Sequence, residues 1–170
     1  MQKFLSLLLS IVLLTGCATS AKDPSRHAPD TVALAKLLPV LEKNKVTNFH
    51  YQDWCKLLSY KRGSFVKTPE PDYCRAQPSE TPKAFSTKAE ADFEQMWQQV
   101  KLTRSGVYVI SDIRYDAAGK IVYAEFDCTH EFVRQRYVYE PGYKLAADLP
   151  HERWNTKINA NWYYVREDWN

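Results

Sequence analysis

The sequence has few glycines, little net charge and no metal-ligand spacing, and each shortage excludes a class of protein. It holds five glycines and contains no G-x-S-x-G and no glycine-rich phosphate loop, so neither a hydrolase nucleophile turn nor a nucleotide fingerprint is present. The formal net charge is +3 and the basic residues form no run, so we expect no nucleic-acid partner. Cysteine and histidine never occur as C-x-x-C or H-x3-H, which argues against a zinc site.

The only long apolar run lies near the N-terminus and is too short to span a membrane. Lys3 precedes Phe4–Leu14, a stretch of apolar residues and serines. As a helix, this run would cover only about half of a ~30 Å hydrocarbon core. A positive residue followed by a short apolar run is typical of an export signal, so we expect a signal peptide here.

The run ends in Leu14-Thr15-Gly16-Cys17, which resembles the lipobox cut by the bacterial lipoprotein signal peptidase. This resemblance implies that residues 1–16 are removed and that the Cys17 thiol carries diacylglycerol and palmitate. Ala18, rather than Asp, follows the cysteine, which implies the outer membrane of a Gram-negative bacterium. Several acyl chains, at about 0.8 kcal/mol per buried methylene, would hold the protein there, facing the periplasm or the cell surface.

Beyond the predicted lipid anchor, composition divides the chain in two. Residues 17–30 are small, polar and proline-bearing, so we expect the lipidated cysteine to be followed by a flexible tether. Residues 31–170 are long enough for one domain with its own core. Aromatic residues make up 14% of the chain, which favours a compact, β-rich structure.

Three cysteines remain after Cys17, and an exported protein is expected to oxidise two of them. Pairing Cys55 with Cys74 closes a short, proline-containing loop, worth roughly 3 kcal/mol on the chain-entropy model. Cys128 is then left as a free thiol.

Three segments have apolar residues at helical spacing. They are 34–41, interrupted by a proline, 51–58, and 87–100. The last is the clearest, because Thr87 and Glu90 form a capping box at its start.

After the third predicted helix, apolar residues recur at every second position, which is typical of β-strands. Val107–Tyr115 and Lys120–Cys128 predict a hairpin that pairs Ile113 with Val122 and Val109 with Phe126. This register turns Cys128 toward the core.

A second hairpin is predicted to turn at Thr129-His130 and to return through Glu131–Glu140. Its register would place Phe126 opposite Val133 on the core face. On the other face it would pair Glu125 with Arg134 and Tyr123 with Arg136. With a fourth strand over Thr156–Arg166, the predicted fold class is α+β, with helices packed on one face of a four-stranded antiparallel β-sheet, as in cystatin-like or NTF2-like folds.

Several residues around Cys128 are candidates for catalysis, and each also has a non-catalytic interpretation. A nucleophilic cysteine needs an exposed thiolate, whereas the predicted register buries this thiol. His130-Glu131-Phe132-Val133-Arg134 lacks the final histidine of H-E-x-x-H and lies on a hairpin, so it predicts no zinc protease. Glu125 and Asp127 could form an acid/base pair, but a charge ladder facing Arg134 is favoured. We assign no catalytic residue, cofactor or metal ligand.

Three C-terminal segments, 124–128, 134–139 and 152–158, resemble the surface-adhesin protein E lipoproteins. This resemblance implies a small outer-membrane lipoprotein with an antiparallel sheet and packed helices. It also implies binding to host matrix and plasma proteins.

Two functions from different classes therefore compete. The preferred one is a non-catalytic binding module, adhesin-like or specific for an envelope partner, that contacts its protein partner through Tyr108, Tyr123, Arg134 and Arg136. Tyrosine and arginine are enriched in interface hot spots, and the aromatic run 162–164 is a second possible contact. The alternative is a small envelope hydrolase acting on glycan or lipid through Glu125 and Asp127. An enzyme should place these carboxylates in a concave pocket, and a binding module on an open face.

Overall fold

The computed structural model describes residues 23–67, 74, 82–128 and 133–168, so the predicted signal peptide and Cys17 lie outside it. Within these ranges one mixed sheet of nine strands has the order β4-β3-β2-β1-β5-β6-β7-β9-β8, and only the β3–β4 pair is parallel. The strands are β1 Val46–Gln52, β2 Cys55–Tyr60, β3 Ser64–Lys67, β4 Lys83–Ala84, β5 Val109–Tyr115, β6 Ile121–Asp127, β7 Val133–Tyr139, β8 Arg153–Lys157 and β9 Trp162–Asp168. The fold is mostly β, and the prediction of helices on a four-stranded, cystatin-like or NTF2-like sheet is wrong.

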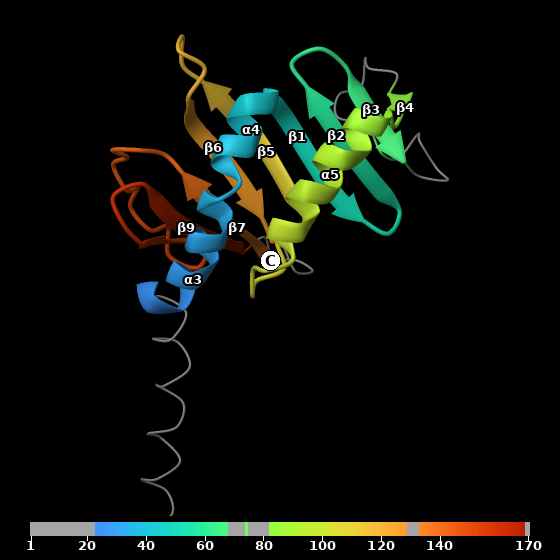
Figure 1. Cartoon of the computed structure of the whole chain (residues 1–170). Helices are drawn as coiled ribbons and strands as arrows, with labels where there is room; N and C mark the ends of the chain where they lie inside the picture. The colour runs from blue at the N-terminus through green and yellow to red at the C-terminus, as the bar shows by residue number, and fades with distance from the viewer. Residues whose placement is uncertain (1–22, 68–73, 75–81, 129–132, 169–170) are drawn as a thin grey trace, which may run out of the picture.

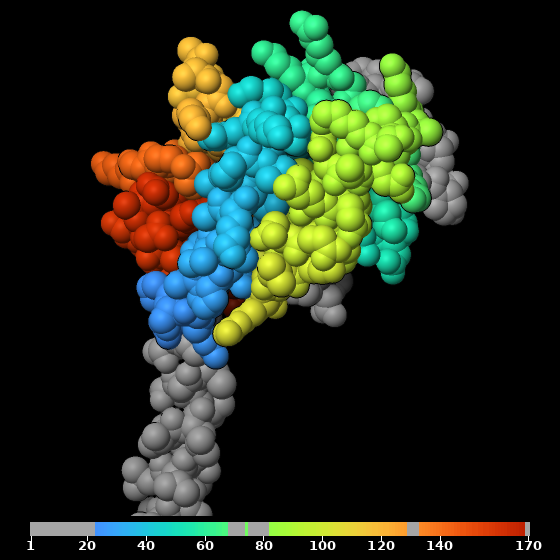
Figure 2. All heavy atoms as spheres, in the orientation of Figure 1, coloured from blue at the N-terminus to red at the C-terminus, as the bar shows by residue number. Residues whose placement is uncertain are grey.

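The helices lie across one face of this sheet (Figure 1). They are α3 Pro24–Ala35, α4 Leu38–Asn44 and α5 Thr87–Val100. Their side chains cover that face in the space-filling view (Figure 2). The main core lies between the helices and the sheet and includes Leu34, Leu41, Met96, Phe49, Ile110, Phe126 and Tyr137. We call the other side of the sheet the open face.

Segment 51–58 is not the predicted helix but the hairpin of β1 and β2, which turns at Asp53-Trp54. Leu58 enters the main core, while Cys55 and Leu57 join a second, small cluster with Cys74. A strand buried on both faces has apolar residues at spacings that imitate a helix. The Cys55–Cys74 disulfide is present, as predicted, with Cα atoms 5.3 Å apart.

The predicted β5–β6 register is wrong by one residue. Phe126 pairs with Ile110 rather than with Val109, so Ile110 is the residue that enters the core. The pairing shifts after Ser111 and again after Arg114, and Asp112 adopts a left-handed φ of 47°. The error is already present at the turn, because Tyr115 pairs with Ile121 and a five-residue loop, 116–120, sets the register of the hairpin.

The predicted β6–β7 register is also wrong, by four residues, since Phe126 pairs with Tyr137 and not with Val133. The predicted turn at Thr129-His130 lies outside the described residues. Because side chains alternate with a period of two, a four-residue shift changes the partners but not the faces. Arg134 and Arg136 consequently remain on the same face as Glu125.

The predicted last strand, Thr156–Arg166, is two strands. β8 and β9 pair as a hairpin around residues 158–161. The Asn159 side-chain oxygen accepts hydrogen bonds from the backbone N–H groups of Asn161 and Trp162 at 2.9 and 3.0 Å. This Asx-type turn reverses the chain where the sequence pattern showed only continuous alternation.

α3 begins before the predicted boundary between tether and domain. Asp23 caps the helix by accepting the Ser25 N–H, and Pro24 occupies its first turn, where it is favoured. Asp30, only 2% exposed, accepts the backbone N–H groups of Arg104 and Ser105 at 2.8 and 3.1 Å. Residues 24–30 therefore belong to the folded domain, a correction to the tether expected over 17–30.

The other two helices follow the sequence closely. The helix predicted over 34–41 is interrupted between α3 and α4. Pro39 lies in the first turn of α4, in agreement with the predicted interruption by a proline. α5 has the predicted bounds, but its cap is one residue earlier, because Ser86 Oγ accepts the Ala89 N–H at 3.2 Å.

Candidate functional site

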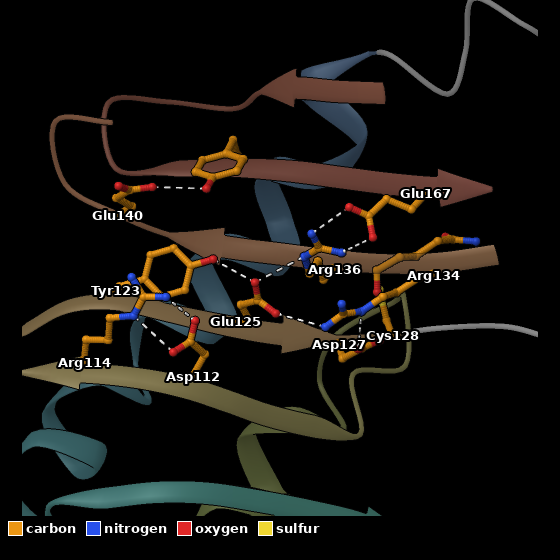
Figure 3. A network of polar contacts seen from close by, with 12 residues as sticks. Asp112, Arg114, Tyr123, Glu125, Asp127, Cys128, Arg134, Arg136, Glu140 and Glu167 are labelled. Atoms are coloured by element: carbon orange, nitrogen blue, oxygen red, sulfur yellow. Dashed lines mark hydrogen bonds and ion pairs between the residues drawn. The ribbon is translucent and has the colours of Figure 1, made fainter. Parts of the chain in front are cut away.

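A network of ion pairs joins three neighbouring strands on the open face (Figure 3). Glu125 and Asp127 belong to β6, Arg134 and Arg136 to β7, and Glu167 to β9. Residues that alternate with them, such as Phe126 and Tyr137, enter the core. Alternation therefore turns the charged side chains away from the helices.

Each arginine bridges two carboxylates. Arg134 contacts Glu125 at 3.0 Å and Asp127 at 3.2 Å. Arg136 forms a bidentate pair with Glu167, with both N–O distances 2.9 Å, and lies 3.4 Å from Glu125. Glu125 is thus shared by both guanidinium groups, and the network continues across β6, β7 and β9.

The two arginines differ in exposure, which separates their roles. The side chain of Arg136 is 12% exposed, and that of Arg134 is 38% exposed. Hydrogen bonds from Arg136 are the main cause of the lowered pKa of Glu167, so this carboxylate is held in its ionised form. Arg136 consequently fixes the strands, while Arg134 is the cation that solvent or a partner can reach.

One tyrosine, Tyr123 on β6, joins the network to β5. Tyr123 Oη donates to Glu125 at 2.7 Å, and burial together with this bond raises the pKa of Tyr123. The Arg114 guanidinium lies 4.3 Å from the centre of the Tyr123 ring and pairs with Asp112. These contacts hold a tyrosine and a second exposed arginine at the end of the network opposite Arg134 (Figure 3).

The structure brings together three of the four predicted contact residues, Tyr123, Arg134 and Arg136. The fourth, Tyr108, lies before β5, and its ring is 6.0 Å from that of His50 on β1. Glu167 was missed because the predicted last strand ended at Arg166 and was not paired with β7. A β7–β9 pairing would have placed Glu167 opposite Arg134.

The Cys128 thiol is buried, as the sequence predicted. It is 1% exposed and donates to the Gln135 carbonyl oxygen at 3.3 Å. Burial raises its pKa to about 12, so the thiol stays protonated and is a poor nucleophile. His130 and Glu131, the other members of that motif, lie outside the described residues.

Glu125 and Asp127 do not have the surroundings of an acid/base pair. Both are bound by Arg134, and the pockets that we identify among the described residues are lined by other groups. In the same part of the chain no three His, Cys, Asp or Glu side chains gather to hold a metal ion. The open face can contribute charge and hydrogen bonds to a partner, and no reaction follows from its geometry.

No protein family, curated protein or solved structure matches this chain. Among the helices that the structure describes, none combines the length and the apolar character needed to cross a bilayer.

Proposed function

We propose that this protein is a lipid-anchored lipoprotein of the outer membrane and acts as a non-catalytic binding module. It holds a protein partner with the open face of its sheet, around Arg134, Tyr123 and Arg114. The observation that carries this proposal is the ion-pair network, because it fixes arginine and tyrosine side chains in place before any partner arrives. Preorganised side chains lose little conformational entropy on binding.

The partially exposed arginines suit a protein partner better than a small ligand. The Arg134 and Arg114 side chains are 38% and 60% exposed, and their carboxylate partners lie beside them on the sheet. A partner carboxylate can share either guanidinium, while Tyr123 adds apolar contact area. Arginine and tyrosine are both enriched in interface hot spots.

The anchor half of the proposal depends on Cys17. Cys17→Ser should abolish incorporation of labelled palmitate, because a hydroxyl cannot form the thioether that carries the diacylglyceryl group. The uncut precursor should accumulate in membrane fractions. As a control, Cys128→Ser should label normally, and label retained by Cys17→Ser would contradict the anchor.

The binding half is tested by photo-crosslinking in growing cells. A photoreactive phenylalanine analogue at position 114, on the open face, should give a specific crosslinked protein band. The matched control is the same analogue at Val32, which is 63% exposed on α3 and lies on the helix-covered side. Adding Arg134→Gln should reduce the band from position 114, and equal bands from both positions would reject the open face as the contact.

A further inference from the structure

A second candidate site, separate from the open face, lies beneath α3. A pocket of about 340 Å³ is bounded by α3, the loop after α5, and strands β7 and β9. Three arginines line it: Arg26 from α3, Arg104 from the loop and Arg166 from β9. They come from three parts of the chain that are far apart in sequence, so the fold itself gathers the positive charge.

The pocket lining holds one carboxylate, that of Asp30, alongside its three arginines. Asp30 Oδ1 accepts the Arg104 backbone N–H at 2.8 Å. Asp30 Oδ2 accepts the Ser105 backbone N–H at 3.1 Å and the Tyr137 hydroxyl at 2.9 Å. Asp30 contributes at most one negative charge against three guanidinium groups, so the lining has an excess of positive charge.

A chain of hydrogen bonds fixes a histidine at the pocket wall. Since Tyr137 Oη donates to Asp30, it accepts from His27 Nδ1–H, 3.1 Å away. The His27 ring stacks on Tyr164 with centroids 4.1 Å apart, and Tyr164 Oη donates to Gln135 at 2.6 Å. The wall is therefore rigid and aromatic on one side and cationic on the other.

Two buried donors in the pocket lack acceptors among the described residues. They are Ser105 Oγ and Arg166 Nε. Ser105 lies close enough to Tyr137 and Cys128 to offset part of the rise in their pKa values, but it forms a well-aligned hydrogen bond with neither. Arg166 is held with its guanidinium 5.3 Å from the Trp154 ring. Buried donors are nearly always satisfied in proteins, and a change of rotamer would turn either donor toward an acceptor bound in the pocket.

We propose that this pocket binds a phosphate-bearing anion. Arginines bind phosphate oxygens through charge-assisted, often bidentate hydrogen bonds, and Ser105 Oγ can donate to a further oxygen. The remaining volume accommodates a small organic group against His27 and Tyr164. The site is cationic and concave, whereas the open-face network is flat and internally paired, so the two sites have different ligands.

The phosphate has two possible sources, a soluble phosphate monoester or a phospholipid headgroup. Pro24 follows Cys17 by seven residues, which reach at most about 25 Å. If Cys17 is lipidated as proposed above, headgroups lie within reach of the pocket, and only this lipid option depends on that anchor.

The test uses the full chain purified in a non-ionic detergent and titrated calorimetrically with inorganic phosphate, glycerol phosphate and short-chain phosphatidylglycerol. We expect saturable binding that Arg166→Gln and Arg104→Gln each weaken about tenfold or more. Arg104 is exposed, so its substitution does not threaten folding. The matched control is Lys83→Gln, an exposed cation on β4 at the other end of the sheet, which should bind like the wild type.

Tighter binding of phosphatidylglycerol than of glycerol phosphate identifies a headgroup site, and the reverse order identifies a site for a soluble ester. The inference is overturned if no phosphate compound binds saturably, or if both arginine variants bind like the wild type. Arg134→Gln should leave phosphate binding unchanged, so failure of this site and failure of the open face give different results.

Discussion

Arg134 and Arg136 lie two positions apart on β7, and their roles differ because their surroundings differ. Arg136 is nearly buried between Glu125 and Glu167, whereas Arg134 reaches solvent. Removing one partner of a buried ion pair leaves uncompensated charge in a low-dielectric setting, while an exposed pair contributes little. Stability and binding should therefore be separable at these two positions.

Arg136→Ala should destabilise the fold by about 2 kcal/mol, because it leaves the partly buried Glu167 without its bidentate partner. Arg134→Ala should cost about 1 kcal/mol or less. Urea unfolding at neutral pH measures both values, and a companion Arg136→Ala/Glu167→Ala variant should recover part of the loss. Equal losses at positions 134 and 136 would show that the two arginines do not differ as described. Binding experiments should consequently substitute Arg134 alone.

At single positions the sequence indicated some environments well. The inward orientation of Cys128 and its lack of reactivity followed from alternation alone. The split between Arg134 and Arg136 did not, because it depends on Glu167, which approaches β7 through a pairing across distant parts of the chain. The arginine pocket was missed for the same reason, since Arg26, Arg104 and Arg166 meet only in the folded chain.

At the scale of elements, the sequence predicted a helix correctly where its own residues determine it and no pairing with a distant segment is needed. α5 has a stripe of apolar residues and a cap, and its predicted bounds agree with the structure. The hairpin of β1 and β2 was mistaken for a helix because Cys55 and Leu57 face one cluster and Leu58 the other. Registers failed because they depend on where the chain turns, and alternation does not fix that point: Tyr115 pairs with Ile121, and Phe126 pairs with Tyr137.

The attachment of α3 gives a prediction at this scale. Asp30→Ala should destabilise the protein by roughly 2–4 kcal/mol, because two backbone N–H groups and the Tyr137 hydroxyl lose their buried acceptor. Asp23→Ala, an exposed cap on the same helix, should cost about 1 kcal/mol. Thermal unfolding compares the two. If Asp30→Ala melts like the wild type, α3 does not pack on the domain as described.

At the scale of the whole molecule, the described residues form a twisted, nine-stranded sheet with unlike faces (Figure 1). One face buries apolar side chains beneath α3, α4 and α5, and the other presents arginine, carboxylate and tyrosine groups across β5, β6, β7 and β9. Alternation predicted two-faced strands, but it could not supply their number or order. The order requires pairs such as β1–β5 and β7–β9 that join distant segments. Fold class was therefore less predictable than the face on which each charged residue lies.

The most direct measurement is the affinity of the purified protein for the partner crosslinked from position 114. The account predicts that Arg134→Gln raises the dissociation constant about fivefold or more, since truncating a hot-spot contact costs more than 1 kcal/mol. Two matched variants, Arg104→Gln in the pocket and Lys83→Gln on β4, should bind like the wild type. An unchanged dissociation constant for a stably folded Arg134→Gln, or an equal loss in all three variants, would contradict binding through the open face.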